Sequence, residues 1–123
     1  MAAQAGTIAE TIEQYGSYRK LRLAWTSATG GGWTGTTVNK YTGKIIGLKT
    51  DPGATAPTDN YDITLADSDG DDVLLGAGID RDTANTEYVA SASLGMVVDS
   101  ALTLTIAGAG DAKIGAIAVW IQH

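Results

Sequence analysis

The sequence contains no cysteine, no phenylalanine and a single histidine. The lack of cysteine excludes a disulfide scaffold, a thiol nucleophile and cysteine-based zinc or iron–sulfur sites, and it fits folding in a reducing cytosol. The histidine is His123, the final residue, and a frayed terminus is a poor place for a catalytic base that neighbouring groups must orient. We therefore expect a protein that is not an enzyme and that binds no cofactor.

Long apolar runs are also missing, because no stretch approaches the roughly 20 residues of a membrane span. The first residues, Met1 to Gly6, lack the basic start and apolar block of a signal peptide. We therefore expect a protein made in the cytoplasm with no membrane partner.

Basic residues are few and unevenly placed. The net charge is −6, so a phosphate backbone would repel the chain on average and no nucleic-acid partner is expected. Residues 1–50 hold six bases and two acids, whereas residues 51–99 hold one base and eleven acids. If these halves separate in space, subunits attract head to tail or dock one face on a charged lattice. If they interleave in one sandwich, the charges mix.

What the sequence has in abundance is glycine, 16 residues in all, with many threonines and alanines. Its 123 residues make one domain with one core, and this composition favours short strands joined by tight turns. The clearest strand places Leu21, Leu23 and Trp25 on one face. The predicted strands cover residues 20–25, 36–50, 61–66, 73–75, 87–90, 96–106 and 114–121.

Turn residues suggest how these strands connect. Asp67–Asp71 resembles a hairpin tip between 61–66 and 73–75, and Gly108–Asp111 is expected to join 96–106 to 114–121 as a hairpin. The last strand is apolar at nearly every position, which predicts a central place in its sheet. Gly43 and Gly47 are candidate bulge positions. Residues 51–60 contain both prolines and are predicted to form a long surface loop.

The expected fold is all-β: an antiparallel β-sandwich or barrel of about seven or eight strands in a single domain. Residues 18–123 would form the sandwich. Residues 1–17 would form an extended N-terminal arm or an edge strand.

The acidic run Asp67, Asp69, Asp71 and Asp72 invites a comparison with a calcium-binding EF-hand loop. The match fails at loop position six, where Asp72 replaces glycine, and at position twelve, where Gly78 replaces glutamate. We expect a solvated hairpin tip and no specific metal site, with weak calcium binding at the tip left open.

Five residues are candidates for contact with another protein. Ile8 and Ile12 lie on the N-terminal arm, which would add a strand to a neighbour's sheet edge or be disordered. Trp33 lies in a predicted flexible loop, residues 27–35, just after Gly30–Gly32, and is either folded onto the core or kept as a binding anchor. Pro52 and Pro57 mark the proline loop.

An ordered string of strand and turn signatures resembles a known group of proteins. It includes Ala24–Ser27, Tyr41–Ile45, Pro57–Leu65, Asp67–Leu74 and Arg81–Glu87, and it extends over roughly residues 18–121. The pattern is similar to that of small head decoration, or cement, proteins of tailed bacteriophages. The resemblance implies a sandwich- or barrel-like subunit that self-assembles, with trimers favoured over dimers, and binds the major capsid protein on the exterior of the virion.

Two other functions remain alternatives. One is a different virion component on the same kind of fold, such as a tail, head–tail connector or fibre-associated protein. The other is a carbohydrate-binding module, in which Trp33, Tyr41 or Tyr88 would stack on sugars.

Overall fold

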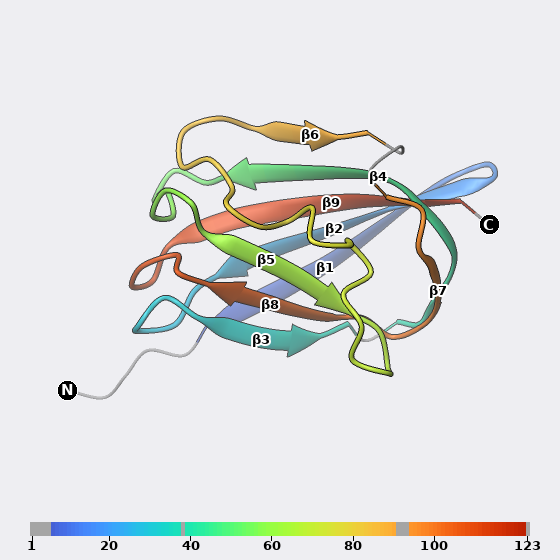
Figure 1. Ribbon diagram of the computed structural model, residues 1–123, viewed down its shortest axis with the longest axis horizontal. Helices are drawn as coiled ribbons and strands as arrows, with labels where there is room; N and C mark the ends of the chain where they lie inside the picture. The colour runs from blue at the N-terminus through green and yellow to red at the C-terminus, as the bar shows by residue number, and fades with distance from the viewer. Residues whose placement is uncertain (1–5, 38, 91–93, 123) are drawn as a thin grey trace.

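Nine strands and no helix make up the described part of the chain, residues 6–37, 39–90 and 94–122, in the computed structural model (Figure 1). No helix among these residues is therefore long and apolar enough to cross a membrane. The strands are β1 (Thr7–Tyr15), β2 (Tyr18–Thr26), β3 (Trp33–Thr36), β4 (Tyr41–Pro52), β5 (Asp62–Ala66), β6 (Glu87–Val89), β7 (Val97–Ser100), β8 (Thr103–Ala107) and β9 (Ile114–Gln122).

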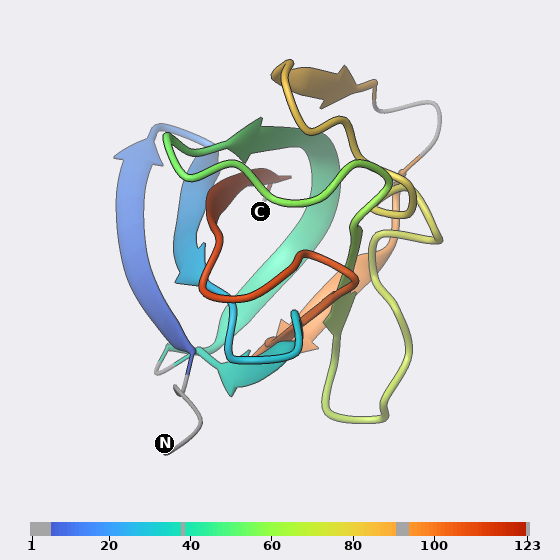
Figure 2. The same cartoon turned by 90° about the vertical axis from the view of Figure 1, so that its left-hand side faces the viewer.

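The strands form two antiparallel sheets that pack face to face (Figures 1 and 2). The larger sheet has the order β1-β2-β9-β4-β6, with β7 also paired to β4, and the smaller has the order β3-β8-β5. The all-β sandwich expected from the sequence is confirmed, with nine strands in place of seven or eight.

The core lies between the sheets and follows from period-two alternation. Leu21, Leu23 and Trp25 of β2 are at most 1% exposed, and they lie beside Gly115, Ile117 and Val119 of β9 in the register of the sheet. β9 lies between β2 and β4, so its predicted central position is confirmed. The bulge expected near Gly47 is also present, because the β4–β9 register shifts between Ile45 and Gly47.

The predicted long strand 96–106 is wrong, because the chain changes sheets within it. β7 pairs with β4 in the larger sheet, and β8 pairs with β3 and β5 in the smaller one. The change occurs at Ala101 and Leu102, where the Leu102 N–H donates to the Thr37 hydroxyl. This side-chain acceptor helps to hold the crossing segment in place.

The hairpin predicted between 96–106 and 114–121 is wrong for the same reason. β8 and β9 belong to different sheets, so the turn at Gly108–Asp111 crosses between layers. It is fixed at Ser27, whose hydroxyl donates to the Gly110 carbonyl at 2.6 Å and accepts from the Lys113 N–H at 2.8 Å.

The hairpin predicted at Asp67–Asp71 is only partly formed. A turn is present, but the return segment makes a single bridge, Ala66 to Asp72, and then continues as further turns. The Asp72 carboxylate accepts the N–H groups of Leu65 and Leu74. These bonds compete with a strand ladder, which explains why residues 73–75 form no strand.

The predicted proline loop departs from expectation at its start and at Pro57. β4 continues through Asp51 and Pro52, and Pro52 lies opposite Gly115. Proline is compatible with this position because β6 pairs only with Leu48–Thr50, which leaves the other side of Pro52 without a ladder partner. Pro57 is buried.

Residues 7–15 form an edge strand that pairs with β2 along its whole length, which is one of the two alternatives for the N-terminal segment. The boundary drawn at residue 17 falls in the turn between these two strands.

Two buried tyrosines predict a loss of stability in alkali. Burial raises the pKa of Tyr61 to about 12, and burial followed by the hydrogen bond to Glu10 raises the pKa of Tyr41 well above its ordinary value of 10. Both groups keep their protons longer in the folded state, so their contribution is complete below pH 10 and is lost as the pH rises toward 12. We expect urea unfolding to show a fall of up to about 1.4 kcal/mol per pH unit for each tyrosine between pH 10 and 12. The fall should be smaller in Tyr61→Phe, and an equal fall in that variant would contradict the assignment.

Candidate protein-interaction surfaces

The structure places the five predicted contact residues in different environments. Ile12 is 37% exposed, whereas Ile8 and Trp33 are partly buried and pack against the core. Pro52 is half-buried and Pro57 is buried. A contact role stays a prediction for all five residues, and of these the buried Pro57 ring presents the least surface to a partner.

Trp33 does not lie in a glycine loop, because it begins β3 opposite Ile106. Its ring packs so closely on Gly6 that a Cβ there would lie 2.4 Å from Trp33 Cγ. Of the three aromatic residues considered for sugar stacking, Tyr41 is fully buried and only Tyr88 is prominent, with 72% of its surface exposed.

Glu10 of β1 has a role that the sequence did not suggest. In the register of the sheet it lies opposite Leu23, on the core side of the edge strand. Its carboxylate accepts hydrogen bonds from the Tyr41 hydroxyl and, at 3.1 Å, from the Asn39 side-chain amide. It therefore ties the edge strand to the start of β4, and an inward charge of this kind also discourages uncontrolled pairing of the edge.

Replacing Glu10 with alanine should release this connection. We expect a loss of about 1–3 kcal/mol in the free energy of unfolding, because the buried Tyr41 hydroxyl loses its acceptor. Glu13→Ala is the matched control, since Glu13 is exposed on the same strand, and it should change stability by no more than about 0.5 kcal/mol. Urea titration measures both, and equal effects would show that Glu10 has no special role.

The outer face of the larger sheet carries four of the eight lysines and arginines. Lys20, Arg22, Lys44 and Lys49 alternate with buried residues of β2 and β4, so they point away from the core. Cross-strand register places Arg22, Ala118, Lys49 and Tyr88 in one row. We call this surface the basic face, defined by Lys20, Arg22, Lys44, Lys49, Tyr88, Val97 and Trp120.

Two of the four cations of the basic face lie over aromatic rings, and one of these, Lys20, is also opposite Glu13 in the register of β1 and β2. The Lys20 amine is 5.6 Å from the Trp120 ring centroid, and the Lys49 amine is 5.7 Å from that of Tyr88. Within the described residues, the one ion pair joins Arg81 and Glu87, so the four cations have no salt-bridge partner there. The carboxylates Glu13, Asp51 and Asp99 lie only at the margins of the face, on β1, the end of β4 and β7.

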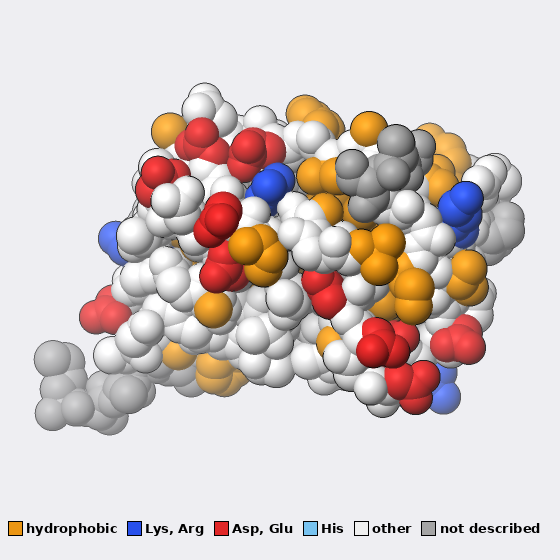
Figure 3. All heavy atoms as spheres, viewed as in Figure 1, with side chains coloured by type: hydrophobic (Ala, Val, Ile, Leu, Met, Phe, Trp, Pro, Cys, Tyr) orange, Lys and Arg blue, Asp and Glu red, His pale blue; other side chains and the backbone are white. Residues whose placement is uncertain are grey.

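The negative charge gathers elsewhere. Residues 57–87 contain nine carboxylates and one base, Arg81. They run through β5 and the long turn-rich segment that follows it. Figure 3 shows that acidic side chains dominate the charge on the side viewed in Figure 1. The two charged parts of the sequence are therefore separated in space to a large extent.

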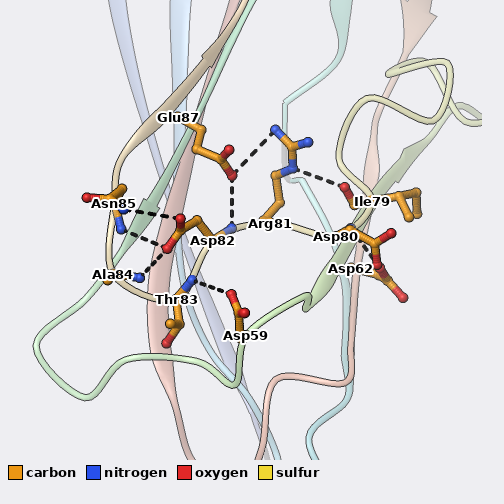
Figure 4. Close-up of polar contacts among 10 residues, drawn as sticks. All are labelled: Asp59, Asp62, Ile79, Asp80, Arg81, Asp82, Thr83, Ala84, Asn85 and Glu87. Atoms are coloured by element: carbon orange, nitrogen blue, oxygen red, sulfur yellow. Dashed lines mark hydrogen bonds and ion pairs between the residues drawn. The ribbon is translucent and has the colours of Figure 1, made fainter.

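A network of polar contacts fixes part of this acidic surface (Figure 4). Glu87 accepts the Asp82 N–H at 2.8 Å and forms the ion pair with Arg81 at 3.8 Å. Hydrogen bonds lower the pKa of the Asp82 carboxyl, the largest effect coming from the Ala84 N–H and the next from the side-chain amide of Asn85. The segment from Arg81 to Glu87 thus presents its carboxylates from a hydrogen-bonded backbone.

The acidic turn first compared with a calcium loop uses its carboxylates for the backbone. Asp67 Oδ1 accepts the N–H groups of Asp69 and Asp71 at 3.0 and 3.1 Å. No group of three or more side chains arranged to hold a metal ion occurs among the described residues, and weak calcium binding stays untested.

No pocket is present in the part of the chain that the structure describes. Comparisons with protein-family models, with curated proteins and with solved structures gave no match.

Proposed function

We propose that this protein is a head decoration protein of a tailed bacteriophage, which binds the major capsid protein on the outside of the shell and stabilises it. It would be made in the host cytoplasm, assemble with itself, preferably as a trimer, and perform no catalysis. The observation that carries the proposal is the ordered series of strand and turn signatures over residues 18–121, which resembles that group of proteins.

The architecture supports this proposal. The protein is a small sandwich with a well-packed core, and it presents a basic face on one sheet and an acidic surface on the opposite layer. A subunit with two such sides can meet the shell and its neighbours at the same time. On a lattice, many weak contacts add up through multivalency, so each subunit needs only a modest interface.

The copy number in purified virions tests the proposal. We expect gel densitometry to find this chain in numbers comparable with the major capsid protein, because decoration covers the whole shell. A few copies per particle would instead indicate a connector, tail or fibre component, and absence from the particle would exclude a virion role.

A carbohydrate-binding module is the second candidate, and one observation favours it. Tyr88 is 72% exposed with the Lys49 amine near its ring, and exposed aromatic rings of this kind can stack on sugars. A glycan array would support the module if saturable binding is lost in Tyr88→Ala. Tyr41→Phe is the matched control, because Tyr41 is fully buried.

A further inference from the structure

Leu75 is an unusual residue at the surface. Its side chain is 57% exposed and its φ is +54°, a left-handed conformation that is unfavourable for a residue with a Cβ. Bulky residues rarely adopt it, and strain of this kind is concentrated at functional positions.

The turn that presents Leu75 is firmly held. The Asp72 carboxylate accepts the N–H groups of Leu74 and Gly76 at 3.1 and 3.0 Å, and the Asp72 carbonyl accepts that of Leu75. Val73 and Leu74, just before it, are fully buried. Leu75 is therefore presented to solvent from an anchored backbone.

The surroundings of Leu75 have the composition of a binding surface. Ile79 in the same segment is 38% exposed, and the carboxylates of Asp69, Asp71 and Asp80 lie on exposed residues nearby in the sequence. An apolar centre with a charged rim is the usual arrangement of a protein interface. We call residues 67–80 the acidic turn.

The basic face has the complementary properties. Its four cations have no salt-bridge partner among the residues described by the structure, and Tyr88 and Val97 are 72% and 65% exposed. Figure 2 shows β1 and β2 on one side of the molecule and the segment after β5 on the other. The turn does reach the end of β7, where the Ser68 N–H donates to the Ser100 hydroxyl at 3.1 Å, but within one copy no ion pair joins the acidic turn to the basic face among the described residues.

We propose that the acidic turn of one copy docks on the basic face of a second copy, with Leu75 as the apolar anchor. Charge complementarity identifies the occupant as a second copy of this chain. The acidic turn of that copy supplies carboxylates that can pair with the cations of the basic face. The contact is heterologous and closes into a ring if the rotation between copies permits. It deepens the proposed function, since it gives the self-assembly of a decoration protein a specific interface.

A charge-swap experiment tests the pairing. One variant carries Arg22→Glu with Lys49→Glu, and the other carries Asp69→Lys with Asp71→Lys. In sedimentation velocity at low salt we expect the unaltered protein to associate, each variant alone to be monomeric, and a mixture of the two variants to associate again. Association of the unaltered protein should weaken as salt screens the charges. Lys40→Glu with Lys113→Glu is the control, because it changes the net charge equally outside the basic face and should leave association intact.

A second variant separates binding from folding. In Leu75→Gly the left-handed strain disappears, so thermal stability should stay equal or rise. The same change removes the apolar anchor, and we expect the dissociation constant of the complex to increase at least about tenfold. An unchanged dissociation constant would overturn the role of Leu75.

Other results would overturn the pairing itself. These are an unaltered protein that stays monomeric at all concentrations, or a mixture of the two variants that does not associate. Binding of single-stranded oligo(dT) that is lost in the Arg22→Glu, Lys49→Glu variant would reassign the basic face to nucleic acid. Decoration is judged separately by copy number in virions, so a monomeric subunit that still coats the shell would refute only the inference about self-association.

Discussion

Replacing Gly43 with alanine is expected to destabilise the protein by about 3 kcal/mol or more. Gly43 has a φ of +134°, and a Cβ at this position would lie 2.3 Å from the backbone oxygen of Gln122 at the end of β9. Backbone atoms cannot yield as a flexible side chain does. The substitution therefore combines an unfavourable dihedral with an overlap between two paired strands of the larger sheet.

Gly30→Ala separates these two causes. Gly30 has a φ of +97°, but nothing lies within 4 Å of a Cβ built there. The free energy of unfolding of Gly30→Ala should fall only by the cost of the unfavourable dihedral, about 1–2 kcal/mol. Guanidinium unfolding measures both variants, and an equal loss would show that the close approach to Gln122 contributes nothing.

Replacing Trp25 with alanine is the second large expected effect, about 3–5 kcal/mol. Trp25 is 1% exposed, and its ring centroid is 5.7 Å from that of Tyr61, just before β5. The same ring lies against β9 at Gly115, where an added Cβ would be 2.4 Å from Trp25 Cζ2. One side chain thus links the two sheets, and its removal leaves a cavity that this backbone cannot close.

Two variants serve as controls for Trp25→Ala. Trp33→Ala should cost less, because Trp33 is only partly buried. Trp25→Phe keeps an aromatic ring and removes an indole N–H that is buried without a hydrogen-bond partner among the described residues, so it should also cost less. Denaturant titration ranks the three, and a Trp33→Ala loss as large as that of Trp25→Ala would contradict the assigned packing.

The strongly alternating segments could be predicted from sequence, whereas the pairing of strands could not. The stretch read as one strand shows why. Val98, Ser100, Leu102, Leu104 and Ile106 are all buried, although the first two belong to the larger sheet and the last two to the smaller. Both sheets face the same core, so a chain that crosses between them keeps its period of two. Alternation reveals which side is buried but not which sheet a residue joins.

The candidate surfaces were only partly visible in the sequence. The uneven distribution of charge was evident, but its separation in space depends on strand order, which brings Arg22 and Lys49 into one row across β9. The burial of Pro57 and the inward position of Glu10 also depend on tertiary packing. The positive φ of Leu75 could not be predicted from the sequence, because leucine rarely adopts this conformation.

Immunogold electron microscopy of purified virions, with antibody raised against this chain, tests the proposed decoration role most directly. A decoration protein should give gold over the whole surface of the head. Gold confined to the tail or to one vertex, or no gold on particles that also lack the chain by gel, would contradict that role.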